Sequence, residues 1–428
     1  MTSAPVRVAM LGCGTVGTGV LALLADNREA ITAKAGRPIA VGPIVVRDLE
    51  KERQAIVPRA LLTRRFEDAL EADVVVEVMG GTTPARGWIL QALAAGRPVV
   101  TANKDVMADH GVEVAAAARA GGVDVFFEAA VGGGIPIIRS LKESLAGTRV
   151  RRIAGILNGT TNYILTRMSE AGTELRQAVT EAQAAGFAEA DPRADLDGLD
   201  AARKLAILSS IAFSARVLPS DVAVEGIGGL SPHDIRNGQR FGWVCKLLAI
   251  AEQAGGGRIS LRVHPAFVEG SHPLAAVRDS YNAIYLQGDA IGDAMFYGRG
   301  AGSLPTASAV MGDLIEAVRF LGQPARGLQA AEGRPALLPP GESVSRFYLR
   351  LQALDRPGVL AQVAAVLGRY DVNIHSVLQT PEGERSAELI VRTHPVRESS
   401  ITNALTELGR LEAVAGVRAC IRLQPDGL

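Results

Sequence analysis

Short apolar runs rich in β-branched residues alternate with Ala- and Leu-rich helical segments through the first third of the chain. Strands that alternate with helices typically form a mostly parallel sheet with helices on both faces. The pattern therefore predicts an α/β domain at the N-terminal end. Its predicted strands are 6–11, 39–46, 74–79, 99–102 and 123–127, with a helix over 18–34.

The pattern changes after residue 134, where longer helical stretches are predicted over 160–185 and 198–215. Strand-like runs occur at 151–157 and 283–287, so this part predicts a second, α+β domain. We interpret the apolar run WVCKLLAIA within it as helical.

A segment rich in Gly and Pro, 322–344, lacks hydrophobic periodicity and predicts a linker. The rest of the chain predicts strands and helices in the order βαββαβ, which is a ferredoxin-like arrangement. These elements are strand 346–353, helix 358–369, strands 373–379 and 386–393, helix 398–411 and strand 417–423.

The charge balance argues for small-molecule partners. Lys plus Arg and Asp plus Glu are equal at 45 each, so no basic field for nucleic acid and no acidic tail is present. The N-terminus enters a strand without a signal-peptide apolar core, and no apolar run has the length of a membrane span. We therefore expect a cytoplasmic protein with no membrane or nucleic-acid partner.

Cysteine and histidine spacing does not favour a metal centre. The three cysteines are far apart without a CxxC pair, and the six histidines include no pair at metal-ligand spacing. Neither a disulfide framework nor a zinc-dependent alcohol dehydrogenase is favoured.

A glycine-rich loop, GCGTVG, joins the first predicted strand to a helix. Gly12 permits a tight turn and Gly14 lets the backbone approach a pyrophosphate, while Gly17 completes the G-x-G-x-x-G spacing. Thr15 and Val16 lie between Gly14 and Gly17, at a helix N-terminus whose N–H groups attract anions. The loop predicts a dinucleotide site, with an ordinary Gly-rich turn as the alternative.

The end of the second predicted strand carries the sequence VVRD. Arg47 stands where NAD-specific proteins usually place an acid for the ribose hydroxyls, with Asp48 beside it. A 2′-phosphate would suit Arg47, so NADP is favoured over NAD. A solvated surface arginine is the alternative.

Lys104, in TANKD, lies just beyond the strand 99–102, at the strand end where ligands of such folds sit. An enzyme that oxidises an alcohol or reduces a carbonyl needs a general base or acid, and lysine can serve as either. A surface lysine is the alternative.

Five carboxylates crowd the segment GFAEADPRADLDGLDAARK. A calcium loop is excluded, because its spacing would put Arg193 and Lys204 at the first and last ligand positions. Asp200 and Lys204 are four residues apart and share a face of a helix predicted to begin near Gly198. The other acids suit the loop and the helix start. The five are Glu189, Asp191, Asp195, Asp197 and Asp200.

These motifs together resemble bacterial homoserine dehydrogenase. The resemblance covers residues 6–320 and rests on GCGTVG, TANKD, EAAVGGGIPII, GILNGTTNYIL, the acidic segment and GRGAGSLPTASAV. The C-terminal DRPGVLAQVAAVLGRYDVNIHSV resembles an ACT domain. The family interconverts L-homoserine and L-aspartate 4-semialdehyde with NAD(P), within threonine and methionine synthesis.

The resemblance implies roles for individual residues. Lys104 and Lys204 would line the reacting centre, with Lys204 the proton donor to the aldehyde oxygen. Asp200 would contact the substrate hydroxyl and Glu189 its ammonium group. A turn residue or helix cap is as good an interpretation of Thr160 as a substrate-binding role. The remaining substrate-binding residues would be Asp195, Asn158, Gly159 and Thr160.

EAAVGGGIPII resembles the family's loop for a monovalent cation, Na⁺ or K⁺, although its residues alone would suggest a hinge. The implied ligands are Glu128 and the carbonyls of Val131, Gly133 and Ile135. By the same resemblance Gly302 backs onto the cofactor.

The implied domains are a Rossmann-like nucleotide-binding domain, an α+β catalytic and dimerisation domain and a ferredoxin-like ACT domain. A homodimer or homotetramer is expected, with threonine as effector at Asp355, Gly358 and Asn373. The ACT domain could equally serve only to pair subunits. The ranges are 1–135 completed by helix 305–321, then 136–304, linker 322–344 and 345–428.

Three other functions remain to be weighed. An aspartate-semialdehyde dehydrogenase needs a cysteine nucleophile, for which only Cys245 is roughly placed. A phosphoglycerate-type dehydrogenase needs a histidine and an acid that we do not find in a matching context. A non-catalytic protein that binds nucleotide and amino acid would not need both lysines.

Overall fold

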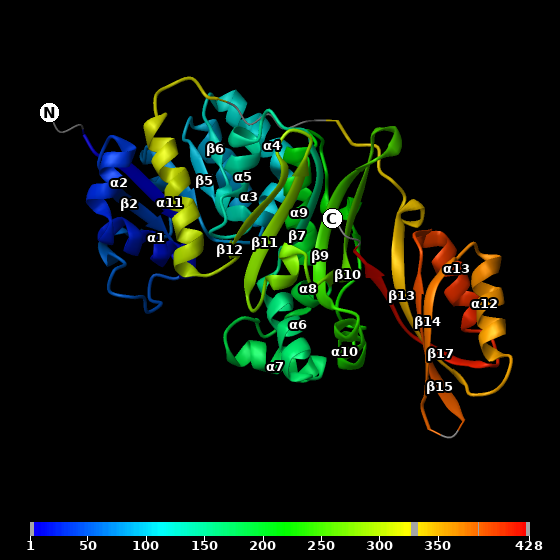
Figure 1. Cartoon of the computed structure of the whole chain (residues 1–428). Coiled ribbons are helices and arrows are strands. Elements are labelled where there is room, and N and C mark those ends of the chain that lie inside the picture. Colours follow the sequence, from blue (N-terminus) through cyan, green and yellow to red (C-terminus); the bar gives the residue numbers. More distant parts are fainter. Residues whose placement is uncertain (1–3, 327–332, 384, 425–428) are drawn as a thin grey trace. The chain divides into compact units, whose positions relative to one another are not determined.

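The computed structural model describes residues 4–326, 333–383 and 385–424, and within it the chain forms two compact units. Each unit is assembled from three stretches of chain (Figure 1). Residues 327–332 of the predicted linker lie outside the described residues. The first unit is Met1–Arg151, Arg203–Asp221 and Asn282–Pro335; the second is Arg152–Ala202, Val222–Tyr281 and Ala336–Leu428.

The first unit contains a parallel sheet in the order β3-β2-β1-β4-β5-β6. Its strands are near-continuous apolar runs because helices cover both faces. The predicted strands are all present, and a short β3 joins them. The bounds are β1 Val6–Leu11, β2 Ile39–Val45, β3 Leu62–Thr63, β4 Val74–Glu77, β5 Val99–Thr101 and β6 Val125–Phe126.

Two sets of helices cover this sheet (Figure 1). The helix predicted over 18–34 is in fact two helices, because the backbone leaves the helical conformation at Asn27. Helix α11 packs with both of them, and its Val310 and Leu314 enter the core beside Val8 and Met10. The bounds are α1 Thr15–Asp26, α2 Arg28–Ala35 and α11 Ser303–Arg319, with α3 Ala85–Ala94 and α4 Lys104–Gly121 packed together elsewhere on the sheet.

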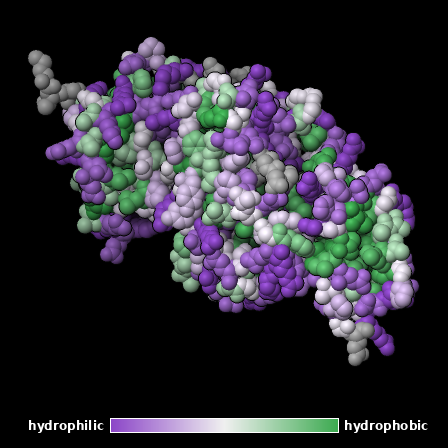
Figure 2. All heavy atoms as spheres, viewed as in Figure 1, coloured by the Kyte–Doolittle hydropathy of each residue, from purple (hydrophilic) through white to green (hydrophobic). Residues whose placement is uncertain are grey.

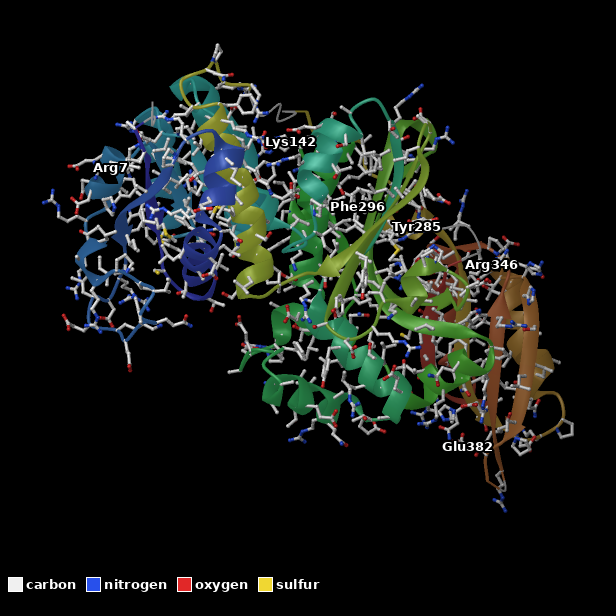
Figure 3. All side chains as sticks on the ribbon, turned by 60° about the vertical axis from the view of Figure 1, so that its left-hand side comes forward. Arg7, Lys142, Tyr285, Phe296, Arg346 and Glu382 are labelled. Atoms are coloured by element: carbon white, nitrogen blue, oxygen red, sulfur yellow. The ribbon has the colours of Figure 1, made fainter. Side chains whose placement is uncertain are left out.

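A hairpin of β11 (Tyr281–Gly288) and β12 (Gly292–Arg299) precedes α11 in the chain. Tyr285 and Phe296 mark its two strands in Figure 3. The short helix α5, Ile137–Arg139, follows the EAAVGGGIP segment.

The second unit contains a sheet in the order β7-β9-β10-β17-β13-β15-β14. The interpretation of WVCKLLAIA as helical is wrong, because this run lies in β9, whose residues from Cys245 to Ala251 are all buried. A fully buried strand loses the alternation that identifies a half-exposed one. The bounds are β7 Val150–Ile156, β8 Ala223–Val224, β9 Trp243–Ala254, β10 Arg258–Glu269, α6 Gly159–Ala171, α7 Leu175–Ala184, α8 Arg193–Leu196 and α10 Pro232–Arg240. Helix α9, Leu199–Ala212, begins in this unit and belongs to the first unit from Arg203 onward.

The C-terminal part of this unit has the predicted βαββαβ order. One face of its sheet packs on two helices around Leu351, Val363 and Ile401. Figure 2 shows a broad apolar surface over this domain, whose exposed apolar residues include Val377 and Leu378. The bounds are β13 Val344–Leu354, α12 Val359–Arg369, β14 Ile374–Pro381, β15 Ser386–Thr393, β16 Val396–Arg397, α13 Glu398–Leu408 and β17 Val414–Leu423.

The C-terminal strand β17 joins this domain to the rest of the second unit. It pairs in parallel with β10 through Ala266 and Arg422, and the Gln424 N–H donates to the Phe267 carbonyl at 2.9 Å. The two sheets are therefore one continuous sheet within the unit. No helix in the described part of the chain is long and apolar enough to cross a membrane.

Candidate active site

The glycine loop has the geometry of a phosphate cradle. Gly12 has φ +93°, and a Cβ there would lie 2.9 Å from the Met79 side chain. A Cβ on Gly17 would lie 3.0 Å from the Gly12 carbonyl, whereas one on Gly14 would meet nothing within 4 Å. Helix α1 begins at Thr15 without a side-chain cap, so its first N–H groups suit an anion.

Helix α11 contacts the same loop. Ser303 Oγ donates to the Thr15 carbonyl at 2.7 Å, and a Cβ on Gly19 would lie 2.7 Å from that hydroxyl. Gly302, just before α11, has φ +120°, which favours glycine. The segment around Gly302 is thus held against the start of α1.

Arg47 is exposed two residues beyond β2, which fits both a cofactor-binding residue and a surface arginine. Asp48 has a different role, because its carboxylate accepts the N–H groups of Glu50 and Lys51. Those bonds shape the turn and leave Arg47 as the charged group at the strand end.

Glu77, which the sequence did not single out, organises the loop that carries Lys104. It is fully buried at the end of β4 and accepts the Thr101 hydroxyl at 2.6 Å. Asn103 also contacts Glu77, donates to the Gly81 carbonyl and caps α4 by accepting the Val106 N–H. Burial raises the pKa of the Glu77 carboxyl. The signal that could have revealed it is an acid inside an apolar strand run.

Ion pairs join the helix that starts at Lys104 to the helix that carries Lys204. Arg203, on α9, lies 2.6 Å from the Asp109 carboxylate and 3.5 Å from that of Asp105, both on α4. The two lysines are the sequence neighbours of these paired residues, and both are half-buried. The first unit thus brings together the two helices that carry the predicted reacting lysines.

Asn158, Asp195 and Asp200 form a hydrogen-bonded cluster in the second unit. Asn158 Nδ2 donates to Asp195 Oδ1 at 2.7 Å and to Asp200 Oδ2 at 2.9 Å. Asp200 is only 8% exposed, and it lies one turn before Lys204 on α9. The predicted helix start near Gly198 is confirmed, and the cluster places two carboxylates beside the first turn of α9.

The start of α6 differs in detail from the sequence expectation. Asn158, not Thr160, caps this helix by accepting the Thr161 N–H at 2.8 Å, and Gly159 is its first residue. The Thr160 hydroxyl donates to the Phe187 carbonyl at 2.7 Å. It therefore ties α6 to the loop that carries Glu189.

Glu189 is exposed, and Gln183 Nε2 holds its main-chain carbonyl at 3.0 Å. Among the residues that the structure describes, its carboxylate has no hydrogen-bonding partner. Asp191 is different, since hydrogen bonds from Arg193 lower the pKa of its carboxyl to about 2. Glu189 is the acid of this loop that can meet an incoming cation.

The EAAVGGGIP segment is tightly turned. Gly132 and Gly133 have φ of +74° and +56°, and a Cβ on Gly133 would lie 2.5 Å from the Gly300 carbonyl. The Glu128 carboxylate is already occupied, because it accepts the Ile138 and Arg139 N–H groups at 2.8 Å. The implied cation ligands, Glu128 and the carbonyls of Val131, Gly133 and Ile135, stay a prediction.

Comparison with known proteins identifies the family. The model of the homoserine dehydrogenase NAD-binding domain matches residues 12–128, the homoserine dehydrogenase model matches 136–315 and the ACT domain model matches 347–413. A homoserine dehydrogenase from Synechocystis sp. is 45% identical over 98% of this chain and 99% of its own length. The chain belongs to the homoserine dehydrogenase family.

Other relatives agree with this assignment. A homoserine dehydrogenase from Bacillus subtilis is 38% identical over 99% of both chains. The crystal structure of a homoserine dehydrogenase from Thiobacillus denitrificans has a TM-score of 0.92 and 41% identity, covering 98% of both chains. The predicted fold class and the oxidoreductase class are thereby confirmed, whereas the roles of individual residues stay predictions.

Cys245, the cysteine that the alternative dehydrogenase would need, is poorly placed for nucleophilic chemistry. Cys245 is 1% exposed, and burial raises the pKa of its thiol to about 12. The thiolate is the nucleophilic form, so Cys245 is poorly suited to attack an aldehyde. This argues against the aspartate-semialdehyde dehydrogenase alternative.

Lys246 is a buried cation that the sequence did not reveal. It is 2% exposed on β9, and its Nζ donates to Asn162 Oδ1 at 3.0 Å and to the Val277 carbonyl. Asn162 lies on α6, three residues after Gly159. Lys246 therefore anchors the helix whose first turn belongs to the candidate substrate site.

Replacing Lys246 with methionine should alter the pH dependence of stability. Burial lowers the pKa of Lys246 to about 8 from 10.5, so between these values the unfolded chain binds more protons than the folded one. Wild-type stability should then rise by up to about 3 kcal/mol across this window, and the variant should lack that gain.

Urea unfolding of wild type and Lys246→Met at about pH 8 and pH 10 measures the difference. The exposed Lys142 offers the control Lys142→Met, which should follow wild type (Figure 3). Equal pH dependence in wild type and Lys246→Met would contradict the prediction.

Proposed function

We propose that the chain interconverts L-homoserine and L-aspartate 4-semialdehyde with NADP, within threonine and methionine synthesis. The observation that carries the proposal is the Asn158, Asp195 and Asp200 cluster one helical turn from Lys204, in a chain of this family. NAD is the alternative cofactor. A bound nicotinamide would supply or accept the hydride.

Lys204 is proposed to give a proton to the aldehyde oxygen in reduction and to take it from the hydroxyl in oxidation. Asp200 supports it by contacting the same oxygen, because it lies on the same face of α9. Lys104, at the start of α4, lines the reacting centre and the cofactor site.

Glu189 is proposed to bind the substrate ammonium group, which its unpartnered carboxylate supports. The Thr160 bond to Phe187 fixes the loop on which Glu189 lies. Gly159 and the acid Asp195 complete the substrate side of the site.

The glycine loop is proposed to bind the cofactor pyrophosphate through Gly12, Gly14 and the first N–H groups of α1, at Thr15, Val16 and Gly17. Gly302 is proposed to lie against the bound cofactor. A mutant of a hyperthermophilic archaeal homoserine dehydrogenase, 27% identical with a TM-score of 0.62 over 73% of this chain, was solved in complex with NADPH, which supports the choice of NADP. A monovalent cation is proposed at Glu128 and the main-chain carbonyls of Val131, Gly133 and Ile135.

Arg47→Ala should weaken NADP binding about 10–100-fold and leave NAD binding within about twofold, because only NADP carries the 2′-phosphate that Arg47 would pair with. Dissociation constants from fluorescence titration test this. Arg65→Ala is the control, since Arg65 is an exposed residue paired with Asp68. Equal weakening of both cofactors would contradict the role.

The ACT domain is proposed to mediate feedback by threonine in a homodimer or homotetramer. Helix α12 begins after Gly358, which has φ +85°, and no side chain caps the first N–H groups of this helix. The exposed Asn373 lies just before β14. Asp355 at this turn accepts a hydrogen bond from Gln379. Subunit pairing alone is the alternative role of the ACT domain. The domain ranges are likewise proposed: 1–135 with helix 305–321, 136–304, linker 322–344 and 345–428.

Product identification tests the proposed reaction. The purified chain should convert L-homoserine and NADP to an aldehyde that hydrazine traps and mass spectrometry identifies as the semialdehyde adduct. Formation of NADPH without that adduct would contradict the proposed substrate.

A further inference from the structure

One arginine bridges the helix of Lys204 and the helix of Lys104 within the first unit. Arg203 Nη1 donates to Asp109 Oδ2 at 2.6 Å, and Arg203 Nε lies 3.5 Å from Asp105 Oδ1. The three side chains are 30–36% exposed, so the bridge is partly shielded from water. Arg203 directly precedes Lys204 in the sequence and Asp105 directly follows Lys104, so the bridge meets each helix beside a predicted reacting lysine.

The two carboxylates of the bridge suit a single guanidinium. Asp105 and Asp109 are four residues apart on α4 and therefore lie on one face of that helix, one turn apart. A guanidinium is planar and presents its N–H groups in a rigid fork, whereas a lysine ammonium is a compact point charge. An arginine that meets both carboxylates therefore restrains the rotation of α4 as well as its separation from α9.

The separation between these helices matters for proton transfer. A general acid or base must come within about 2.6–3.2 Å of the atom with which it exchanges a proton. A misplacement of about 1 Å, caused by a change away from the reacting atoms, can lower a rate by about 100-fold. Lys104 and Lys204 lie on different helices, so a change in the packing of α4 against α9 alters their separation without removing either amine.

We propose that Arg203 is a positioning residue for the proton transfer, acting through its two aspartate partners on α4 to fix the distance between Lys104 and Lys204. The proposal rests on the function proposed above, in which both lysines line the reacting centre. In this role Arg203 contacts neither the substrate nor the cofactor. Its loss should therefore lower kcat and leave the KM values for homoserine and NADP nearly unchanged.

A second ion pair on α4 provides a matched control. Arg86, on α3, donates to the two carboxylate oxygens of Glu113 at 2.8 and 2.6 Å. These side chains are 43% and 40% exposed, similar to those of the bridge, and neither residue is a sequence neighbour of a predicted reacting lysine. Ion pairs this exposed contribute little to stability, so Arg86→Met and Arg203→Met should both stay folded.

Initial rates over a range of L-homoserine and NADP concentrations separate kcat from KM. Arg203→Met should lower kcat about 10-fold, with both KM values within about twofold of wild type. Asp109→Asn should lower kcat less, because Asp105 still pairs, and the double variant should be no slower than Arg203→Met. Arg86→Met should keep the wild-type kcat, and urea unfolding should show a similarly small loss of stability for both arginine variants.

Three outcomes would overturn the positioning role. These are a wild-type kcat in Arg203→Met, an equal loss of kcat in Arg86→Met, which would indicate a general effect of helix packing, and losses that multiply in the double variant, which would show that Arg203 and Asp109 act independently. Failure of the proposed reaction is distinguishable, because wild type itself would then not oxidise L-homoserine, and the role of Arg203 would fall with it.

Discussion

Lys204→Ala is expected to lower kcat by about 10²–10⁴-fold, the usual contribution of a positioned general acid or base. Lys204 lies in the second turn of α9, next to Arg203, whose ion pairs with Asp105 and Asp109 hold α9 against α4. Alanine is the best helix former, so α9 should persist and those ion pairs should remain. Cofactor binding should therefore stay within about twofold of wild type.

Steady-state rates with L-homoserine and a fluorescence titration with NADPH separate these effects. Lys34→Ala, an exposed lysine in the last turn of α2, is the matched control and should behave as wild type. A variant that keeps its kcat, or one that loses cofactor affinity in proportion to its rate, would show that Lys204 has been assigned the wrong role.

Glu189→Gln is expected to raise the KM for L-homoserine about 10–100-fold, because a charge-assisted hydrogen bond to the substrate ammonium contributes about 1.5–3 kcal/mol. The carboxylate is exposed and without a partner among the described residues, so its replacement removes no structural contact. The loop stays tied by Thr160 and Gln183.

Initial rates over a range of L-homoserine concentrations give the KM. Asp197→Asn is the matched control from the same acidic segment, since Asp197 is exposed at the end of α8. An equal rise in KM for both variants would mean a diffuse effect of charge, and an unchanged KM for Glu189→Gln would place the ammonium site elsewhere.

Much of the fold follows from local sequence signals. The apolar runs that form β1, β2 and β4 to β6 predicted a parallel sheet. Turn residues between the C-terminal elements predicted the bounds of most strands and helices of the βαββαβ order to within a few residues. The i, i+4 spacing of Asp200 and Lys204 placed both on one helix face, and α9 has them there. These features depend on periodicity and spacing that a chain shows before it folds.

Other features depend on tertiary contacts that no local pattern encodes. Strand β9 was misread because burial on both faces removes alternation, and the buried amine of Lys246 is satisfied by Asn162 and Val277, which are distant in sequence. Glu77 was missed because its partner Thr101 belongs to the neighbouring strand. The bond from Thr160 to Phe187 likewise joins the first turn of α6 to a loop 27 residues further along the chain.

The most direct test of the account is the initial rate of NADP reduction by the purified full-length chain, followed by near-ultraviolet absorbance. L-homoserine should be oxidised, while 4-hydroxybutyrate, which lacks the ammonium group, should react far more slowly, and Lys204→Ala should show almost no rate with either. No rate with L-homoserine, or equal rates with both alcohols, would contradict the proposal that this chain is a dehydrogenase that recognises homoserine through its acidic loop.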